Sequence, residues 1–224
     1  QPGVGIDEAG IQAVTSNDTF IAAAGMQLEL LVPGADKLTV AAVAPLTGVV
    51  ESLLFDGNLL LAGVAGQGIF IYDTSAGSLS LVGQAPVEAM AMVASGSLVY
   101  AAGGGTGLSV VDVTNPQAPV VVTRILSGEG NLTAITRSGS ALYVTDRAAS
   151  RIDVINLTDP RAPTLTGTID EPSQALRAAN GYLYSSGLIS FPNRSTSSSG
   201  SPLRIFSLSD PLHPVFTGEF LDFA

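Results

Sequence analysis

The sequence predicts an all-β fold made of five similar four-stranded units, and a repeated pentapeptide is the first observation that points to it. Copies of this short apolar stretch, usually closed by a polar residue, begin at Leu28, Ile69, Leu108, Ile152 and Leu203. Their starts are 41, 39, 44 and 51 residues apart. A period of about 40–50 residues with several short apolar runs per unit is typical of the blades of a β-propeller. We therefore expect a propeller of five antiparallel blades, either a complete ring or part of a larger one.

The third unit shows the four predicted strands of a blade most clearly. Its apolar runs lie at residues 90–94, 98–102, 108–113 and 120–125, separated by clusters of Gly, Ser, Thr, Asn and Pro. These residues favour turns, because Gly adopts positive φ, Asn bonds to its own backbone and Pro removes an N–H donor. Four strands joined by such turns form an antiparallel meander. The third run, LSVVDV, is apolar at almost every position, which predicts a strand buried on both faces between neighbouring blades.

The same pattern divides the rest of the chain. We expect an N-terminal extension or linker at residues 1–10, followed by blades at about 11–47, 48–88, 89–130, 131–173 and 174–222. Each repeat supplies its own four strands, so blade five is expected to pack on blade one, or both ends on further blades. The Ser-rich segment 191–202 lengthens the last step of the repeat and is predicted to be a solvated loop.

Composition limits the functional classes. Hydrophobic residues make up 46% of the chain and charged residues 12%, but the apolar runs are far shorter than the ~18 residues of a membrane span. Nine Lys and Arg residues against 19 Asp and Glu argue against nucleic acid as a partner. The absence of Cys excludes disulfides and thiolate chemistry. Gln1 in place of Met indicates a processed or excised product, and the composition favours an extracellular, cell-surface or periplasmic protein.

In the third unit, LSVVD is followed by TNPQAP, and related turns occur at residues 158–163 and 209–214. This combination resembles the LVIVD repeat, and the resemblance extends from about residue 11 to residue 220. It is weakest in the first unit, where Val32 replaces the terminal Asp. The resemblance implies a β-propeller, usually exported or surface-associated and often one module of a longer polypeptide. It implies no catalytic residue.

The last residue of the pentapeptide is polar in four units, as Asp73, Asp112, Asn156 and Ser207. These side chains could form a ring of ligands around the propeller axis. They directly precede turns, however, where short polar side chains accept hydrogen bonds from backbone N–H groups two or three residues ahead. We therefore interpret them as caps.

The sequence predicts no catalytic residue, cofactor site or metal site. The single histidine, His213, lies in a turn, and without Cys a nucleophilic mechanism would have to be built around it. The oxygen-bearing clusters Asp56-Gly57-Asn58 and Asp170-Glu171 do not have the spacing of a calcium loop. The glycine-rich segments 63–68 and 103–107 lack the Lys-Ser/Thr pair of a phosphate-binding loop.

The leading hypothesis is a non-catalytic module that binds a protein partner, or a surface assembly, at the cell exterior. The loops between second and third strands would make the contact, and the candidate contact residues are Asp146, Arg147, Phe191, Asn193 and Arg194. The alternative is a propeller hydrolase or lyase with carboxylates and a metal at the mouth of the axis. Carboxylates converging at one end of the channel would favour this alternative.

Overall fold

Twenty strands form five four-stranded antiparallel sheets in the computed structural model, which describes residues 10–187, 189–190, 199–200 and 202–220. In every sheet the strands lie in chain order. The five predicted four-stranded blades are therefore confirmed. No helix within the described part of the chain is long and apolar enough to cross a membrane.

Each blade consists of four consecutive strands of its own repeat. Blade 1 contains β1 (Ala13–Ser16), β2 (Ile21–Ala24), β3 (Gln27–Pro33) and β4 (Leu38–Pro45). Blade 2 contains β5 (Val50–Asp56), β6 (Leu59–Val64), β7 (Gly68–Asp73) and β8 (Ser80–Ala85). Blade 3 contains β9 (Ala91–Ser95), β10 (Leu98–Ala102), β11 (Leu108–Asp112) and β12 (Val120–Ile125). Blade 4 contains β13 (Leu132–Ser138), β14 (Ala141–Asp146), β15 (Arg151–Asn156) and β16 (Thr164–Ile169). Blade 5 contains β17 (Ala175–Ala179), β18 (Tyr182–Ser186), β21 (Leu203–Ser207) and β22 (Val215–Phe220).

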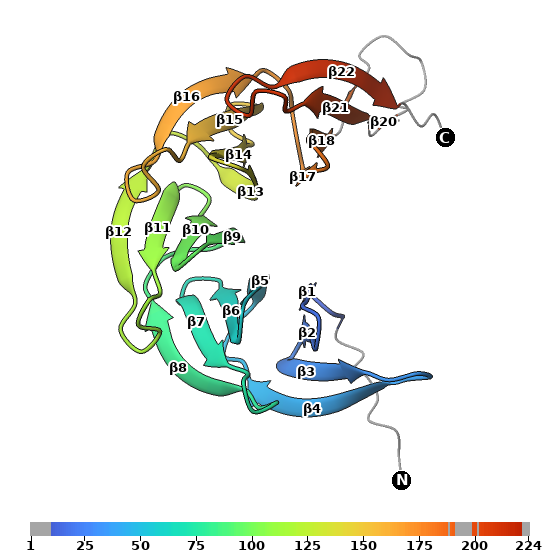
Figure 1. Ribbon diagram of the computed structural model, residues 1–224, viewed down its shortest axis with the longest axis vertical. Helices are drawn as coiled ribbons and strands as arrows, with labels where there is room; N and C mark the ends of the chain where they lie inside the picture. Colours follow the sequence, from blue (N-terminus) through green and yellow to red (C-terminus); the bar gives the residue numbers. More distant parts are fainter. Residues whose placement is uncertain (1–9, 188, 191–198, 201, 221–224) are drawn as a thin grey trace.

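The blades stand side by side around one axis and form an open arc (Figure 1). The first strands β1, β5, β9, β13 and β17 lie innermost and contact one another in sequence, and the fourth strands form the outer rim. Blades 1 and 5 lie apart, on either side of the opening. The expectation that blade 5 packs on blade 1 is therefore wrong, because the curvature set by four blade-to-blade contacts does not bring the ends of the arc together.

Hydrophobic packing between consecutive blades stabilises the arc. Among the described residues, four buried clusters join blades 1 and 2, 2 and 3, 3 and 4, and 4 and 5. In β11, Leu108 and Val110 face blade 4, whereas Val111 faces blade 2. Burying such a side chain contributes about 1.5–3 kcal/mol. A third strand covered by a blade on each side explains why the pentapeptide is apolar at successive positions.

All five pentapeptides carry a β-bulge at the same place, where the third residue is followed by the fourth. The register of the third and fourth strands shifts between Leu30 and Leu31 in blade 1 and between Val110 and Val111 in blade 3, with equivalent shifts in the other blades. A bulge bends a strand and increases its twist. The repeated bulge therefore gives every outer strand the same curvature along the rim.

The insertion in blade 5 contains a small ribbon. Strands β19 (Ile189–Ser190) and β20 (Ser199–Gly200) lie between β18 and β21 in the sequence. They pair antiparallel with each other and form a separate two-stranded sheet. The sequence predicted a loop over residues 191–202, so it missed the second strand of this ribbon. Most of that segment lies outside the described residues.

Candidate functional site

The loops between second and third strands and the links between blades meet at one end of the arc. In an antiparallel meander the second strand ends, and the fourth strand ends, at the same edge of the sheet. We call this end the loop face. The opposite end carries the turns between third and fourth strands, with the Asn/Asp-Pro sequences, and we call it the turn face. The loop face is the candidate functional site.

A hollow lies on the loop face between blades 2 and 3. It is lined by Gly66, Gln67, Gly68, Pro86, Val87, Glu88, Thr106 and Arg124. The Glu88 carboxylate accepts a hydrogen bond of 3.3 Å from the Gly66 N–H, and the Arg124 guanidinium donates one of 3.1 Å to the Pro86 carbonyl. The charged side chains of this hollow thus bind the backbone of the loops and fix their positions.

A second carboxylate, that of Glu51, is electrostatically coupled to Glu88 of this hollow. Glu51 lies on the innermost strand β5, and Glu88 lies on the link that leads into blade 3. Burial, and then the negative charge of Glu88, raise the pKa of the Glu51 carboxyl. Within the described residues, no group of three or more His, Cys, Asp or Glu side chains is arranged to hold a metal ion. No motif in the sequence marks this pair: Glu51 stands within the apolar run that becomes β5, and Glu88 stands just before the run that becomes β9.

A second hollow lies on the loop face between blades 4 and 5. Its walls are formed by Arg147, Ser150, Pro172, Ser173 and Gln174. Arg147 and Ser150 are exposed. This hollow is shallow and polar, and it places a cationic side chain beside several hydrogen-bonding groups at the surface.

Asp146 begins the same loop but has a different role from Arg147. It is 1% exposed, and its Oδ1 accepts N–H groups from Asn131 at 3.0 Å, Ala148 at 3.0 Å and Ala149 at 3.2 Å. A Cβ on Gly130 would lie 2.7 Å from Asp146 Oδ2, so the link passes directly over the carboxylate. Asp146 therefore clamps the link between blades 3 and 4 to the loop of blade 4. Its burial removes it from the surface that a partner could contact, contrary to the expectation from the sequence.

An ion pair between the buried Asp153 and the partly exposed Arg151 supports this clamp. Asp153 is 1% exposed, and Arg151 Nε donates to its Oδ1 at 2.7 Å. Burial raises the pKa of the Asp153 carboxyl, while the hydrogen bond from Arg151 lowers it in part. The Arg151 Nη2 also lies 3.9 Å from Asp146 Oδ2. This pair could not be predicted from the sequence. Asp153 holds the second position of its pentapeptide, and only the fold shows that this position faces the preceding blade.

The other three candidate contact residues, Phe191, Asn193 and Arg194, lie outside the described residues. Of the five candidates, the structure thus places Arg147 at the surface and Asp146 beneath it.

The polar residues that end the pentapeptides cap the turns, as predicted. Asp112 Oδ1 accepts the Thr114 N–H at 2.9 Å and its hydroxyl at 2.6 Å, and Asn156 makes the equivalent bonds to Thr158. Asp73 and Ser207 accept the N–H groups two residues ahead. Asp112 Oδ2 also accepts a 2.8 Å bond from Arg161 of blade 4. The bonds from Thr114, and then the bond from Arg161, lower the pKa of Asp112 to about 2.

His213 lies on the turn face, where its Nδ1 is 2.8 Å from Asp210 Oδ2. Its side chain is 80% exposed. The hydrogen bond from His213, and then one from the Leu212 N–H, lower the pKa of Asp210. These contacts belong to the turn, at the end of the arc opposite the loop face.

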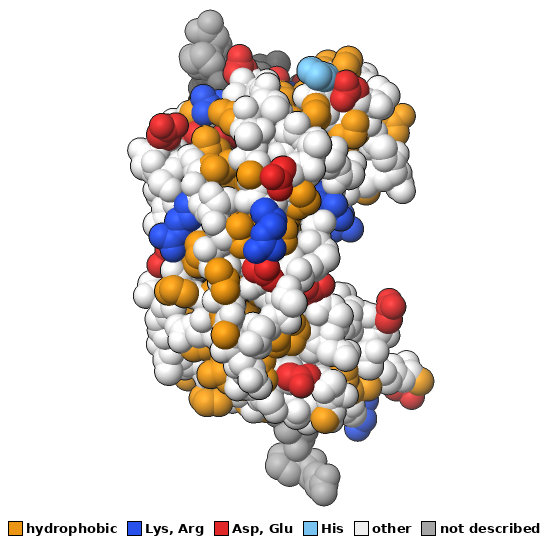
Figure 2. Space-filling view, turned by 60° about the vertical axis from the view of Figure 1, so that its left-hand side comes forward, with side chains coloured by type: hydrophobic (Ala, Val, Ile, Leu, Met, Phe, Trp, Pro, Cys, Tyr) orange, Lys and Arg blue, Asp and Glu red, His pale blue; other side chains and the backbone are white. Residues whose placement is uncertain are grey.

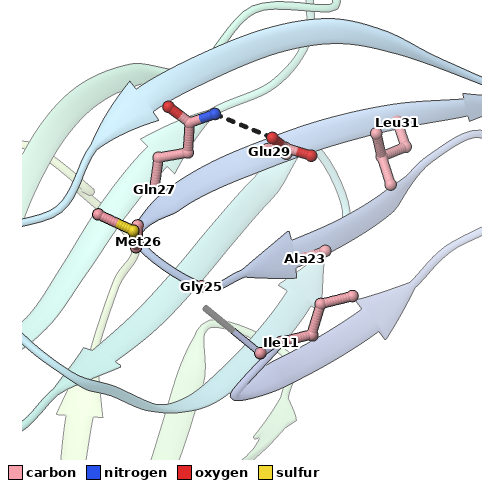
Figure 3. Close-up of a pocket in the computed structure, with 8 residues that line it drawn as sticks. Ile11, Ala23, Gly25, Met26, Gln27, Glu29 and Leu31 are labelled. Atoms are coloured by element: carbon pink, nitrogen blue, oxygen red, sulfur yellow. Dashed lines mark hydrogen bonds between the residues drawn. The ribbon is translucent and has the colours of Figure 1, made fainter. Parts of the chain in front are cut away.

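An apolar hollow opens on the side of blade 1 that faces away from blade 2 (Figure 3). Ile11, Ala23, Met26 and Leu31 supply most of its walls. Glu29 is almost completely buried there and accepts a 2.9 Å bond from Gln27 Nε2. The hollow therefore offers mainly apolar surface, because the Glu29 carboxylate already accepts a hydrogen bond from Gln27.

The five radially arranged four-stranded sheets define the class of this protein as a repeat β-propeller. Residues 88–126, which include all of blade 3, match the family model of the LVIVD repeat. The predicted resemblance to the LVIVD repeat is therefore confirmed for blade 3. No curated protein sequence matches the chain.

Several solved structures share the fold. The β-propeller domain of Cps50 (Swd1) from Myceliophteria thermophila has a TM-score of 0.70 and 15% identity, over 97% of this chain and 74% of that chain. A candidate 6-phosphogluconolactonase from Bacteroides uniformis has a TM-score of 0.73 and 13% identity, over 93% of this chain and 71% of that one. A protein of unknown function from Desulfotomaculum acetoxidans has a TM-score of 0.73 and 12% identity, over 95% and 70% of the two chains. Identities this low show a common fold and not a common activity.

Proposed function

We propose that this chain is a non-catalytic propeller module that binds a protein partner, or a surface assembly, through its loop face. The observation that carries the proposal is that some side chains on that face hold the loops in place, while others are exposed and free to contact a partner. Glu88, Arg124 and Asp146 hold the loops through backbone hydrogen bonds, whereas Arg147 and Ser150 stay exposed. Loops that are rigid before binding lose little conformational entropy on binding, which favours protein recognition.

The charge of the chain supports a protein partner over a nucleic acid. On the outer side of the arc, shown in Figure 2, Lys and Arg side chains are few and lie among Asp, Glu and apolar side chains. The chain carries a net charge of −10, whereas a nucleic-acid backbone attracts clustered Lys and Arg. We further propose that the module lies outside the cell or in the periplasm, because the chain resembles a family whose members are usually exported.

Site-specific photo-crosslinking tests the proposal. A crosslinking amino acid replaces Arg147 on the loop face and, as the matched control, Gln117, an exposed residue on the turn face. The protein is then irradiated with the surface fraction of the organism that makes it. We expect a discrete crosslinked protein from position 147 and not from position 117. Equal crosslinking from both positions, or none from position 147, contradicts binding through the loop face.

A second candidate function, a hydrolase or lyase, is favoured by one observation. Glu51 lies on the innermost strand β5, and its raised pKa, due to burial and then to the charge of Glu88, suits a group that donates a proton. The candidate 6-phosphogluconolactonase among the similar structures provides a substrate class for the test. Glu51→Gln and Glu88→Gln should each abolish hydrolysis of a sugar lactone if this function is correct. Under the leading proposal, the parent protein and both variants leave the lactone at its spontaneous rate of hydrolysis.

A further inference from the structure

A tyrosine on the second strand of blade 3 contacts blade 4, and a tyrosine at the same place in blade 4 contacts blade 5. Blade 5 has a tyrosine at this place too. The second strand of each of these blades carries a tyrosine opposite the third residue of the pentapeptide. The pairs are Tyr100 with Val110, Tyr143 with Val154 and Tyr184 with Ile205. Paired residues of neighbouring strands point to the same face of the sheet. All three tyrosines therefore face away from the preceding blade and towards the next one.

In the first two cases the phenol bonds to the next blade. Tyr100 donates to the carbonyl of Pro160 at 2.9 Å, and Tyr143 donates to the carbonyl of Pro211 at 2.6 Å. Both prolines belong to Asn/Asp-Pro turns of the kind that joins third and fourth strands, and both tyrosines are completely buried. Tyr184 is partly exposed, and the described residues provide no hydrogen-bond partner for its hydroxyl.

Among the described residues, no neighbouring blade covers the face of blade 5 that carries Tyr184. Tyr182 is 41% exposed and Leu203 is 37% exposed. Leu203 and Ile205 occupy the first and third pentapeptide positions, which in the other blades are at most 1% exposed: Leu28, Leu30, Ile69, Ile71, Leu108, Val110, Ile152 and Val154. Those residues are buried because another blade covers them. The open face of blade 5 thus has the composition of an internal blade interface.

The size of the opening identifies what fits there. The chain covers 74% of the Cps50 β-propeller domain and 71% and 70% of the two other similar structures. If the blades are of equal size, this leaves room for about two more in a ring within the usual range of four to eight blades. A second copy of this chain would bring five blades, and its third and later blades would collide with blade 1. A segment of two blades is therefore the occupant that the arc accepts.

We propose that the open face of blade 5 receives a segment of two further blades of the same repeat, which follows this chain in the polypeptide. The Tyr184 hydroxyl donates to the proline carbonyl in the Asn/Asp-Pro turn of the first incoming blade. The second incoming blade lies against blade 1, where the hollow of Figure 3 receives its side chains. Links between successive blades within the chain are only four to six residues long, so a following blade is delivered directly to this face.

The test compares the 224-residue chain with an extended chain. Residues 86–169, which include the link into blade 3, blade 3 itself and blade 4, are copied and joined directly after Phe220. This probe carries the Asn115-Pro116 turn as its first Asn/Asp-Pro turn. Nitration of Tyr184 by tetranitromethane is followed by peptide mass spectrometry, and light scattering gives the oligomeric state. We expect a monomer with reactive Tyr184 before extension, and a monomer with protected Tyr184 after it.

A conservative pair of variants tests the hydrogen bond itself. Tyr184→Phe should lower the melting temperature of the extended chain by about 2 °C, the shift expected for one lost hydrogen bond in a domain of this size. The same substitution should leave the melting temperature of the 224-residue chain unchanged. Tyr182→Phe, the matched control on the same face, should change neither chain.

Several results would overturn the proposal. Tyr184 could be nitrated as fast in the extended chain as in the parent, or the added blades could be digested by protease while the parent part survives. Concentration-dependent self-association that protects Tyr184 in the 224-residue chain would identify a second copy as the occupant instead. If Tyr184→Phe and Tyr182→Phe changed the melting temperature of the extended chain equally, the proposed hydrogen bond from Tyr184 would be ruled out. Partner binding through the loop face is measured separately, so its failure leaves these outcomes unchanged.

Discussion

The Tyr143 hydroxyl of blade 4 donates a hydrogen bond of 2.6 Å to the carbonyl oxygen of Pro211 in blade 5. The phenol is completely buried, and burial, together with the negative charge of Asp210, raises its pKa. The bond therefore joins a second strand to the turn of the next blade across a dry interface. Tyr100 and Pro160 repeat the arrangement one blade earlier.

We expect Tyr143→Phe to lower the free energy of unfolding by about 0.5–1.5 kcal/mol, because the packing is retained and only the hydrogen bond is lost. Equilibrium unfolding in urea measures this difference. Tyr182→Phe is the control, since Tyr182 lies at the surface of blade 5 and should change the stability little. Equal stabilities of Tyr143→Phe and the parent protein would show that the bond makes no net contribution.

Substitutions of Asp112 distinguish two contributions of this turn cap to stability: its hydrogen bonds to Thr114 and its charge, which attracts Arg161. Asp112→Asn should keep the bonds to Thr114, because Asn156 makes the same bonds to Thr158, but it loses the charge that attracts Arg161. Asp112→Ala loses both. We therefore expect the urea midpoint to fall slightly for Asn and further for Ala, while crosslinking from position 147 persists in both. A loss of crosslinking by a variant of unchanged stability would show that Asp112 contacts the partner.

Acid should weaken the same turn. The folded state holds the pKa of Asp112 at about 2, below the usual value of about 3.9 for an aspartate. The stability that depends on the ionised carboxylate is therefore complete above about pH 4 and is lost as the pH falls towards 2. Urea midpoints measured from pH 2 to 5 should fall more steeply for the parent protein than for Asp112→Asn. Parallel curves would show that Asp112 is not a source of the acid sensitivity.

Two glycines at the same strand position offer a matched test of blade packing. Gly83 pairs with Ile71 in blade 2, and Gly167 pairs with Val154 in blade 4. A Cβ on Gly83 would collide with the Pro116 carbonyl oxygen of blade 3, whereas a Cβ on Gly167 meets only the Val154 Cβ, at 4.0 Å. We expect Gly83→Ala to destabilise the protein by about 1–3 kcal/mol, because backbone must move.

Gly167→Ala should be neutral or slightly stabilising, since it restricts the unfolded chain and fits the folded one. Urea unfolding of both variants measures the difference. Similar losses in the two variants would indicate a cost of alanine in the strand itself and not a collision between blades.

Much of the fold could be predicted because it depends on local patterns. The apolar runs and their turns placed β10 and β12 at their observed bounds. The position of Asp112 before a turn predicted its cap, since both partners lie within two residues of each other. The candidate site was less predictable. Asp146 and Arg147 are adjacent in the sequence, and only the fold shows that one is buried and the other exposed.

The sequence by itself determined the repeat, the four strands of each blade and the caps of the turns, because these depend on neighbours along the chain. The tertiary structure decided which contacts join the blades. Tyr100 and Pro160 are 60 residues apart, and Tyr143 and Pro211 are 68 apart, so no local pattern could pair them. It also decided that the arc stays open between blades 1 and 5 (Figure 1). That opening follows from the angle at which each sheet packs on the next, a property of packed side chains that no single repeat contains.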